Sequence, residues 1–322
     1  MLRLLVALAL AGCAPAQTPG PPAVQVQSVS VAPAVTLHVE TFGDGPNVVL
    51  IPGALFLSEQ LRGGLASEDR TLVFYDMRNR GASSRVEDEA TINILADVAD
   101  LEAVRAHIGA EQIALVGYSY LGLMTALYAA EHAGRVSRLV QIGPVPRQWD
   151  TPYPREFVAT EESLSAEGRA AAAAWDVAAA EANAESDQLA LCALQTEAMS
   201  FYLVGDPANA SRVANVCRYE NERPAALGRH FAAHFADIQT RAFPAEPFRA
   251  LTIPTLIVHG TLDRNAPYGA GREWAQTIPD ARLVTVEGGA HNVWLDDPHV
   301  IDDISAFLDG AWPERAEHIA AS

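Results

Sequence analysis

The stretch that decides the fold is residues 113–122, IALVGYSYLG. Its apolar first half predicts a buried strand over residues 113–116, and a helix is predicted over residues 121–132 directly afterwards. Ser119 stands between the two elements, in the order Gly-Tyr-Ser. A serine on a sharp strand-to-helix turn is typical of a nucleophile elbow, which exposes the hydroxyl above a sheet. The usual elbow has glycine two residues after the serine, whereas this chain has Leu121 there.

Strands and helices alternate on both sides of this turn. The helix predicted over residues 91–108 repeats apolar side chains at steps of three and four residues. Several predicted strands are near-continuous apolar runs, as in a parallel sheet that is covered on both faces. We therefore expect an α/β fold with a mostly parallel, doubly wound sheet. The predicted strands, of which the first two form an antiparallel pair, span residues 24–31, 35–42, 47–51, 71–75, 113–116, 136–142, 253–259 and 282–286.

One long segment interrupts this alternation. Residues 143–248 lack a comparable strand pattern and are rich in alanine and acidic residues. An insert of about a hundred residues is too long for a simple loop. We therefore expect an all-helical lid inserted into one α/β core. The expected division is a signal and tether over residues 1–22, core over 23–144, lid over 145–249 and core again over 250–322.

The first residues predict export. Arg3 precedes the apolar run 4–11, and small residues follow, as in a secretory signal. The residues Leu-Ala-Gly-Cys that end at Cys13 resemble a bacterial lipobox, in which the cysteine is lipidated and anchors the protein to a membrane. The alternative is a plain signal peptide cut near residues 14–16, which gives a periplasmic or secreted protein. Membrane contact is expected only through this N-terminal anchor.

Charge and cysteine content limit the possible partners. The net charge is −18, from 40 acidic and 22 basic residues, and this argues against binding of nucleic acid. Cys192 and Cys217 are an even pair and are expected to form a disulfide in an oxidising compartment; the alternative is two buried free thiols. No metal-binding or phosphate-binding motif is present, so no metal or cofactor is expected. Asp76 is interpreted as a loop end and not as a ligand.

Two further polar residues follow predicted strands. Asp263 comes shortly after the strand 253–259, and His291 follows the strand 282–286. The carboxyl ends of parallel strands face one crevice, so Ser119, Asp263 and His291 are predicted to meet there as a catalytic triad. A serine needs a base and the base needs an orienting group, which these residue types supply. His259, at a strand end, is predicted to be a buried structural hydrogen-bonding group.

The candidate oxyanion hole lies at two turns. The residue after a nucleophile donates one backbone N–H, which assigns Tyr120. The turn that follows the strand 47–51 contains Pro52 and Gly53, and its Ala54 N–H is the expected second donor. Both groups would stabilise negative charge that develops on a substrate oxygen.

These motifs resemble α/β-hydrolases of the proline iminopeptidase type. Residues 76–83, DMRNRGAS, are similar to that family's Asp-x-Arg-Gly-x-Gly-x-Ser loop, with Asn79 in place of the first glycine. The segments that end at Asp263 and His291 match as well, and the resemblance covers residues 48–144 and 254–298. The oxyanion turn departs from the family's His-Gly-Gly-Pro-Gly. The resemblance implies an α/β-hydrolase fold and a serine hydrolase that cleaves an ester or amide of a small molecule or short peptide through an acyl-enzyme.

The substrate class stays open at this point. Within the lid, residues 218–222, RYENE, are similar to a family segment whose glutamate holds the free α-amino group of a peptide. This resemblance makes Glu220 a candidate substrate-binding residue of an aminopeptidase; the alternative is a solvated acidic helix end. The alternative functions are a carboxylesterase or lactonase, and a non-catalytic binding protein on the same fold.

Overall fold

The computed structural model describes residues 23–183 and 185–320. Eight strands form one sheet in the order β1-β2-β4-β3-β5-β6-β7-β8. The strands are β1 (Gln25–Ala32), β2 (Val35–Phe42), β3 (Asn47–Pro52), β4 (Arg70–Tyr75), β5 (Ile113–Tyr118), β6 (Val136–Ile142), β7 (Thr255–Gly260) and β8 (Ala281–Val286). The helices are α1 (Ala54–Leu65), α2 (Ile94–His107), α3 (Tyr120–Glu131), α4 (Ala166–Glu181), α5 (Gln188–Leu203), α6 (Pro224–Thr240), α7 (Glu246–Arg249), α8 (Tyr268–Thr277), α9 (Val293–Asp296) and α10 (His299–Leu308).

The strand order contains a switch point beside the elbow. β1 and β2 pair antiparallel, and β2 pairs antiparallel with β4, whereas the pairs from β4 through β8 are parallel. From β3 the chain moves outward to β4, and it then returns to place β5 on the other side of β3. Ligands of doubly wound sheets bind in the crevice outside the carboxyl ends of strands at such a point. Here those ends lead into α1 and α3.

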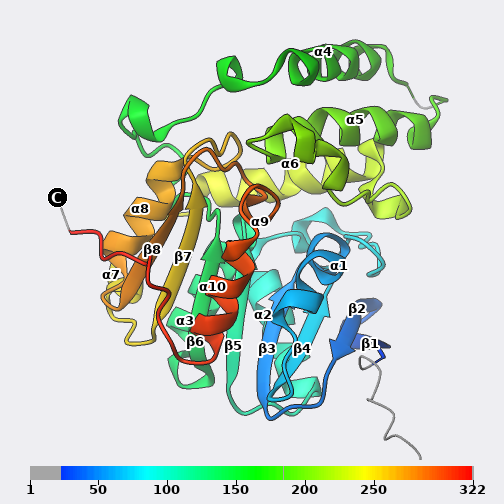
Figure 1. Cartoon of the computed structure of the whole chain (residues 1–322). Helices are drawn as coiled ribbons and strands as arrows, with labels where there is room; N and C mark the ends of the chain where they lie inside the picture. The colour runs from blue at the N-terminus through cyan, green and yellow to red at the C-terminus, as the bar shows by residue number, and fades with distance from the viewer. Residues whose placement is uncertain (1–22, 184, 321–322) are drawn as a thin grey trace, which may run out of the picture.

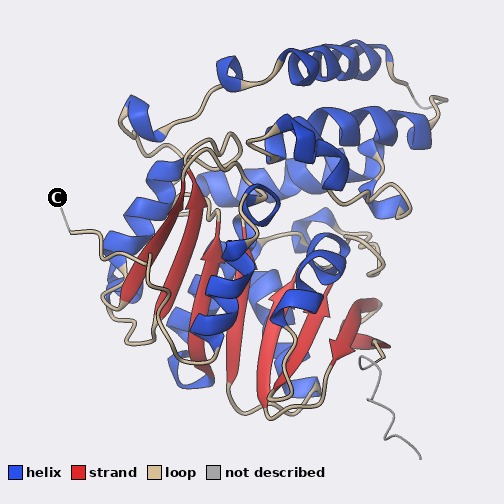
Figure 2. Cartoon of the chain, in the orientation of Figure 1, coloured by secondary structure: helices blue, strands red, loops and turns tan. Residues whose placement is uncertain are grey.

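Each face of the sheet has its own core. Side chains alternate along the strands, so Leu115 faces one core while Val116 faces the other. α2, α3 and α8 pack against the first core, and α1, α9 and α10 pack against the second. Figure 1 shows α1 and α10 on the side toward the viewer, and Figure 2 shows the single sheet between helices. The expected fold class, an α/β-hydrolase fold with a mostly parallel sheet, is confirmed.

A helical segment separates β6 from β7. Between Ile142 and Thr255 the described residues form α4 to α7, short 3₁₀ turns and loops, with no strand. In Figure 1, α4, α5 and α6 lie together beyond one end of the strands, and α4 packs on α5. We call residues 143–254 the lid.

Helix α1 was not expected from the sequence. Helix α1 follows β3 directly, and its N-cap, Gly53, provides no side-chain hydrogen bond. Its first turn contains no acidic residue, and Gly63 and Gly64 lie near its end. The usual start signals of a helix are therefore missing from the sequence. In the part of the chain that the structure describes, no helix is long and apolar enough to cross a membrane. The signal, the tether and Cys13 lie outside the described residues.

Candidate active site

The serine at the end of β5 occupies an unusual backbone conformation. Ser119 has φ 58° and ψ −127°, and α3 begins at the next residue. Its N–H donates to the Ile142 carbonyl at 2.8 Å, which fixes the turn to β6. Glycine is required at Gly117, because a Cβ there would lie 2.3 Å from Oγ1 of Thr125. These contacts hold Ser119 on a sharp turn between strand and helix.

The departure from the usual elbow is accommodated on the pocket side. Leu121, which stands where the elbow usually has glycine, is 7% exposed and belongs to the core that α2 and α3 cover. Its Cδ1 lies 3.1 Å from the place that a Cβ on Gly53 would take. The leucine side chain therefore turns away from the strand and packs against the start of α1.

Asp263 and His291 form a buried pair. Nδ1 of His291 donates to Oδ2 of Asp263 at 2.6 Å, and the two residues are 3% and 1% exposed. Oδ1 of Asp263 accepts the backbone N–H groups of Asn265 and Ala266, both at 2.9 Å. Burial by itself would raise the pKa of Asp263, but the positive charge and hydrogen bonds of His291 and His259 hold that pKa below its ordinary value. The carboxylate is thus ionised and fixed in direction.

His259 also touches this carboxylate. The sequence predicted a buried structural histidine, and the side chain is indeed fully buried. Its Nε2 lies 3.0 Å from the Ala266 carbonyl oxygen and 3.2 Å from Oδ2 of Asp263. The contact with Asp263 was not predicted, although His259 lies near the end of β7 and Asp263 follows that strand four positions later.

Ser119 and His291 line one cavity. The ring of Tyr118 packs on that of His291 with centroids 4.6 Å apart, and the Tyr118 hydroxyl donates to Asn292 at 2.6 Å. Among the described residues there is no hydrogen bond between the Ser119 hydroxyl and His291. Such bonds are often long without substrate and shorten when it binds. The structure thus brings together the three residues that the sequence proposed.

Two backbone N–H groups at the starts of helices are the candidates for the oxyanion hole. Ala54 and Tyr120 are the first residues of α1 and α3, where a helix leaves its N–H groups unpaired. Neither amide donates a hydrogen bond to another residue in the described ranges. Gly53, with φ 94°, makes the tight turn that starts α1. The N-termini of two helices favour negative charge at this place.

The cavity extends from Ser119 into the lid and has a volume of about 430 Å³. Its wall is mostly apolar and aromatic, with contributions from both the core and the lid. The large aromatic side chains of the wall are Phe56, Tyr120, Trp149, Phe231, Phe235 and Trp294. Such a wall suits a bulky apolar group of a ligand.

The charged groups of the wall compensate one another. Arg80 donates from Nε and Nη2 to the carboxylate of Glu222, at 2.9 and 2.7 Å. The guanidinium also lies over the rings of Phe56 and Phe231, 5.5 and 5.2 Å from their centroids. Burial and the charge of Arg80 lower the pKa of His234 to about 4, so this pocket histidine is neutral. The interior of the cavity therefore presents no unpaired charge from these groups.

The structure places Glu220, the candidate for binding a substrate amino group, at the surface, in line with the alternative interpretation. This side chain is 71% exposed, does not line the cavity, and pairs with Arg223 and Arg85 at 3.7 and 4.0 Å. Glu222 of the same segment does line the cavity, but its carboxylate is bound by Arg80. Neither residue offers a free carboxylate to a substrate ammonium. The reason is the 3₁₀ turn Glu220–Glu222, which directs these two side chains differently.

The lid cysteines form the expected disulfide. Cys192 on α5 is joined to Cys217, and the bridge ties α5 to the segment before α6. Cys192 and residues of both linked segments line the cavity. Within the described residues, no cluster of histidine, cysteine and acidic side chains has the arrangement of a metal site.

Residues 46–298 match the alpha/beta hydrolase fold family. The match covers most of the chain, so the chain belongs to this family and is a hydrolase.

Individual proteins resemble the chain in sequence or in fold. The chain is 28% identical over 245 residues to a non-heme haloperoxidase of Rhodococcus erythropolis. The aligned residues cover 74% of this chain and 82% of the relative. It is 27% identical over 288 residues to a pimeloyl-[acyl-carrier protein] methyl ester esterase of Chromobacterium violaceum, covering 85% of this chain and 98% of the relative. The 2-hydroxy-6-oxo-6-phenylhexa-2,4-dienoate hydrolase of Rhodococcus sp. strain RHA1 has a similar fold, with TM-score 0.68, 19% identity, and coverage of 90% of this chain and 100% of that one. The proline iminopeptidase subtype finds no support in these relatives.

Proposed function

We propose that this hydrolase is a serine carboxylesterase that acts through an acyl-enzyme. The observation that carries the proposal is the buried Asp263–His291 pair, whose histidine lines the same cavity as Ser119 on its elbow. Serine as nucleophile, histidine as base and aspartate as orienting group are the parts that acyl transfer requires. The two free amides of Ala54 and Tyr120 support the same chemistry.

In the proposed reaction, Oγ of Ser119 attacks the ester carbonyl carbon while Nε2 of His291 takes the hydroxyl proton. The C=O electron pair moves to oxygen, and the resulting oxyanion accepts hydrogen bonds from the Ala54 and Tyr120 N–H groups. The C–O bond to the alcohol then breaks, and His291 returns the proton to that alcohol. A water, deprotonated by His291, attacks the acyl carbonyl carbon; the bond from this carbon to Oγ of Ser119 then breaks, His291 returns the proton to Oγ, and the acid is released. Asp263 holds the imidazole in one orientation throughout.

The proposed substrate is an uncharged ester with a bulky apolar group; a lactone would react by the same steps. The aromatic wall supports this choice, since burial of apolar surface supplies most of the affinity in such pockets. The Arg80–Glu222 pair argues against an aminopeptidase, because a substrate ammonium would have to displace Arg80. The pimeloyl methyl ester esterase, a relative over most of both chains, is an esterase by name.

The decisive assay compares aryl esters of increasing acyl size with aminoacyl arylamides. We expect hydrolysis of the esters and at least a hundred-fold slower turnover of the arylamides. Ser119→Ala should abolish turnover and fluorophosphonate labelling. Ser200→Ala is the matched control, because this buried lid serine donates only to the Glu197 carbonyl of its own helix, and it should retain both. Arylamide turnover that exceeds ester turnover, or labelling that survives Ser119→Ala, would contradict the proposal.

We further propose that the protein is exported and held by a lipid on Cys13. The Cys192–Cys217 disulfide supports this proposal, since structural disulfides persist in oxidising compartments. Mass spectrometry of the N-terminal peptide tests it. A diacylglyceryl group on Cys13 is expected, and an intact residue 1 on the mature protein would contradict export.

A further inference from the structure

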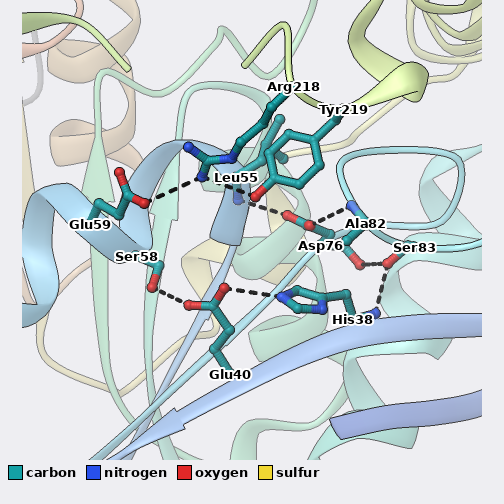
Figure 3. A network of polar contacts seen from close by, with 10 residues as sticks. All are labelled: His38, Glu40, Leu55, Ser58, Glu59, Asp76, Ala82, Ser83, Arg218 and Tyr219. Atoms are coloured by element: carbon teal, nitrogen blue, oxygen red, sulfur yellow. Dashed lines mark hydrogen bonds and ion pairs between the residues drawn. The ribbon is translucent and has the colours of Figure 1, made fainter. Parts of the chain in front are cut away.

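The loop between β4 and α2 carries a carboxylate that binds the start of α1. Asp76 is fully buried, and its Oδ1 accepts the Leu55 N–H at 2.7 Å. Its Oδ2 accepts the Ala82 N–H at 2.9 Å, as Figure 3 shows. Leu55 directly follows Ala54, the residue whose amide is the proposed oxyanion donor. One side chain thus joins this loop to the oxyanion turn.

Asp76 does for α1 what an N-cap residue does for other helices. A helix leaves its first N–H groups unpaired, and a side-chain oxygen usually accepts the second or third of them. Gly53 at the N-cap of α1 has no side chain for this purpose, and the first turn of α1 contains no acidic residue. The Leu55 N–H is the second of the helix, and its acceptor comes from a residue 21 positions away. The direction of the first turn of α1 therefore depends on Asp76.

The loop fits closely around this carboxylate. A Cβ on Gly81 would lie 2.1 Å from Oδ2 of Asp76, and Gly81 has φ 49°. Oγ of Ser83 donates to the Asp76 carbonyl at 2.7 Å and accepts the His38 N–H of β2 at 2.9 Å. Figure 3 shows Asp76 between the Leu55 and Ala82 amides, with His38 and Ser83 below. The loop thus encloses the carboxylate at Gly81, and Ser83 joins the backbone of Asp76 to β2.

Two lid residues form hydrogen bonds with the same loop. Nδ2 of Asn221 donates to the carbonyls of Gly81 and Ser83, at 3.1 and 2.9 Å. Oε1 of Glu222 accepts the Gly81 N–H at 2.8 Å, besides its bonds with Arg80. Asn221 and Glu222 are 7% and 1% exposed, so these bonds form in the interior. Hydrogen bonds and the backbone of residues 81–83 therefore connect the lid, through Asp76, to the Leu55 amide.

We propose that Asp76 is the positioning residue of the oxyanion hole, and that Asn221 of the lid acts on the hole through it. When the lid is seated, Asn221 fixes the loop, the loop fixes Asp76, and Asp76 turns the Ala54 N–H toward the carbonyl that Ser119 attacks. This inference rests on the proposed esterase function. It adds that seating of the lid and assembly of the oxyanion hole are one event.

The experiment uses the full-length protein and four variants: Asp76→Asn, Asp76→Ala, Asn221→Ala and Asn183→Ala. Asn183 is the matched control, because its side chain accepts a bond from Glu185 inside the lid and is exposed. The readouts are kcat and KM on an aryl ester, and the Kd of phenylboronic acid. This probe forms a tetrahedral adduct with a serine and places an oxygen in the oxyanion hole. Thermal unfolding shows that each variant is folded at the assay temperature.

We expect kcat to fall about 10- to 100-fold in Asp76→Ala and less in Asp76→Asn, which keeps one acceptor oxygen. Asn221→Ala should lower kcat severalfold. The Kd of the boronic acid should rise in step with the loss in kcat while KM stays within about twofold, because a misplaced donor affects the tetrahedral state and not the bound ester. Asn183→Ala should match the wild type.

Two results would overturn the inference while the proposed function stands. One is an active wild type whose kcat and boronic acid affinity survive in folded Asp76→Ala. The other is a change in KM alone in Asn221→Ala. If Asp76→Ala does not fold, Asp76→Asn and Asn221→Ala decide the matter by the same readouts. Absence of Ser119-dependent hydrolysis in the wild type would instead refute the proposed function.

Discussion

His259 near the end of β7 and Asp263, which follows the strand four residues later, meet in the interior, with Nε2 of the histidine 3.2 Å from Oδ2 of the aspartate. The same oxygen accepts the hydrogen bond from Nδ1 of His291 at 2.6 Å. One carboxylate oxygen therefore faces two imidazoles, only one of which lines the cavity. The second imidazole, together with His291, lowers the pKa of Asp263 without lining the cavity.

His259→Leu should weaken the protein at low pH. A depressed aspartate pKa stabilises the fold above the ordinary pKa, and this stabilisation is lost as the pH falls through the folded value. Without His259, the folded pKa of Asp263 rises, so the loss begins at a higher pH. Urea unfolding between pH 3 and 7 should show this shift, along with a loss of about 1–3 kcal/mol at pH 7. Acid unfolding that coincides in wild type and variant would contradict the expectation.

Asp97→Asn should flatten the dependence of stability on pH. Burial raises the pKa of Asp97 to about 7, against the hydrogen bond from Tyr120. Arg78, Asp100 and Asp237 also act on it. The folded protein thus holds a proton that the unfolded chain releases above its ordinary pKa of about 4. The free energy of unfolding should therefore fall as the pH rises from about 4 to 7, by at most roughly 4 kcal/mol from this group.

The measurement for Asp97→Asn is a series of denaturant unfolding curves at pH 4 to 8. The free energy of unfolding of the variant should increase relative to that of the wild type as the pH rises. Part of the slope should remain, because burial also raises the pKa of Asp76, to about 6. Asp303→Asn, which changes an aspartate paired with Arg315 at the surface, is the control and should keep the full slope. If the free energy of unfolding of Asp97→Asn falls with pH as steeply as that of the wild type, the carboxyl of Asp97 is ionised in the folded protein.

Removal of the disulfide should loosen the pocket wall. The bridge closes a loop with a sequence separation of 25, and its loss by Cys192→Ser with Cys217→Ser should cost about 3 kcal/mol. Because residues of both linked segments line the cavity, KM for a bulky ester should rise more than KM for an acetyl ester. Dithiothreitol should reproduce both effects in the wild type and leave the double variant unchanged. Equal changes for the two esters would rule out a local effect on the pocket.

Ile238→Trp should restrict the substrate by size. Ile238 of α6 is 5% exposed and lines the cavity, so a larger side chain there fills space that a bulky ester group needs. We expect kcat/KM to fall at least tenfold for a benzoate ester and to stay within about threefold for an acetate ester. The ratio of the two kcat/KM values is the measured quantity. An unchanged ratio in a folded variant would place the bulky group elsewhere.

The sequence predicted those parts of the site that depend on the sheet. Ser119, Asp263 and His291 each follow an apolar strand, and the carboxyl ends of parallel strands meet in space whatever the lid does. The starts of α3 and of the turn after β3 follow from the same rule. These positions needed no knowledge of side-chain packing.

Positions that depend on contacts between distant segments could not be predicted in this way. Helix α1 lacks a local cap, because its acceptor is Asp76 on another loop. Asp76 itself has the sequence context of an ordinary loop end. Glu220 and Glu222 differ only in the side of a short 3₁₀ turn that they occupy, and no apolar period specifies that side. The contact of Arg80 with Glu222, and not with Glu220, becomes visible only once the position of the lid is known.

The backbone of Ser119 has a consequence for the whole molecule. At φ 58° and ψ −127° a residue with a Cβ is about 1–3 kcal/mol worse off than in an ordinary conformation, whereas glycine adopts such angles readily. Ser119→Gly should therefore give an inactive protein that unfolds at a higher temperature than the wild type. Glycine would make the fold more stable at this position, so the serine there is explained by its proposed role in catalysis and not by stability.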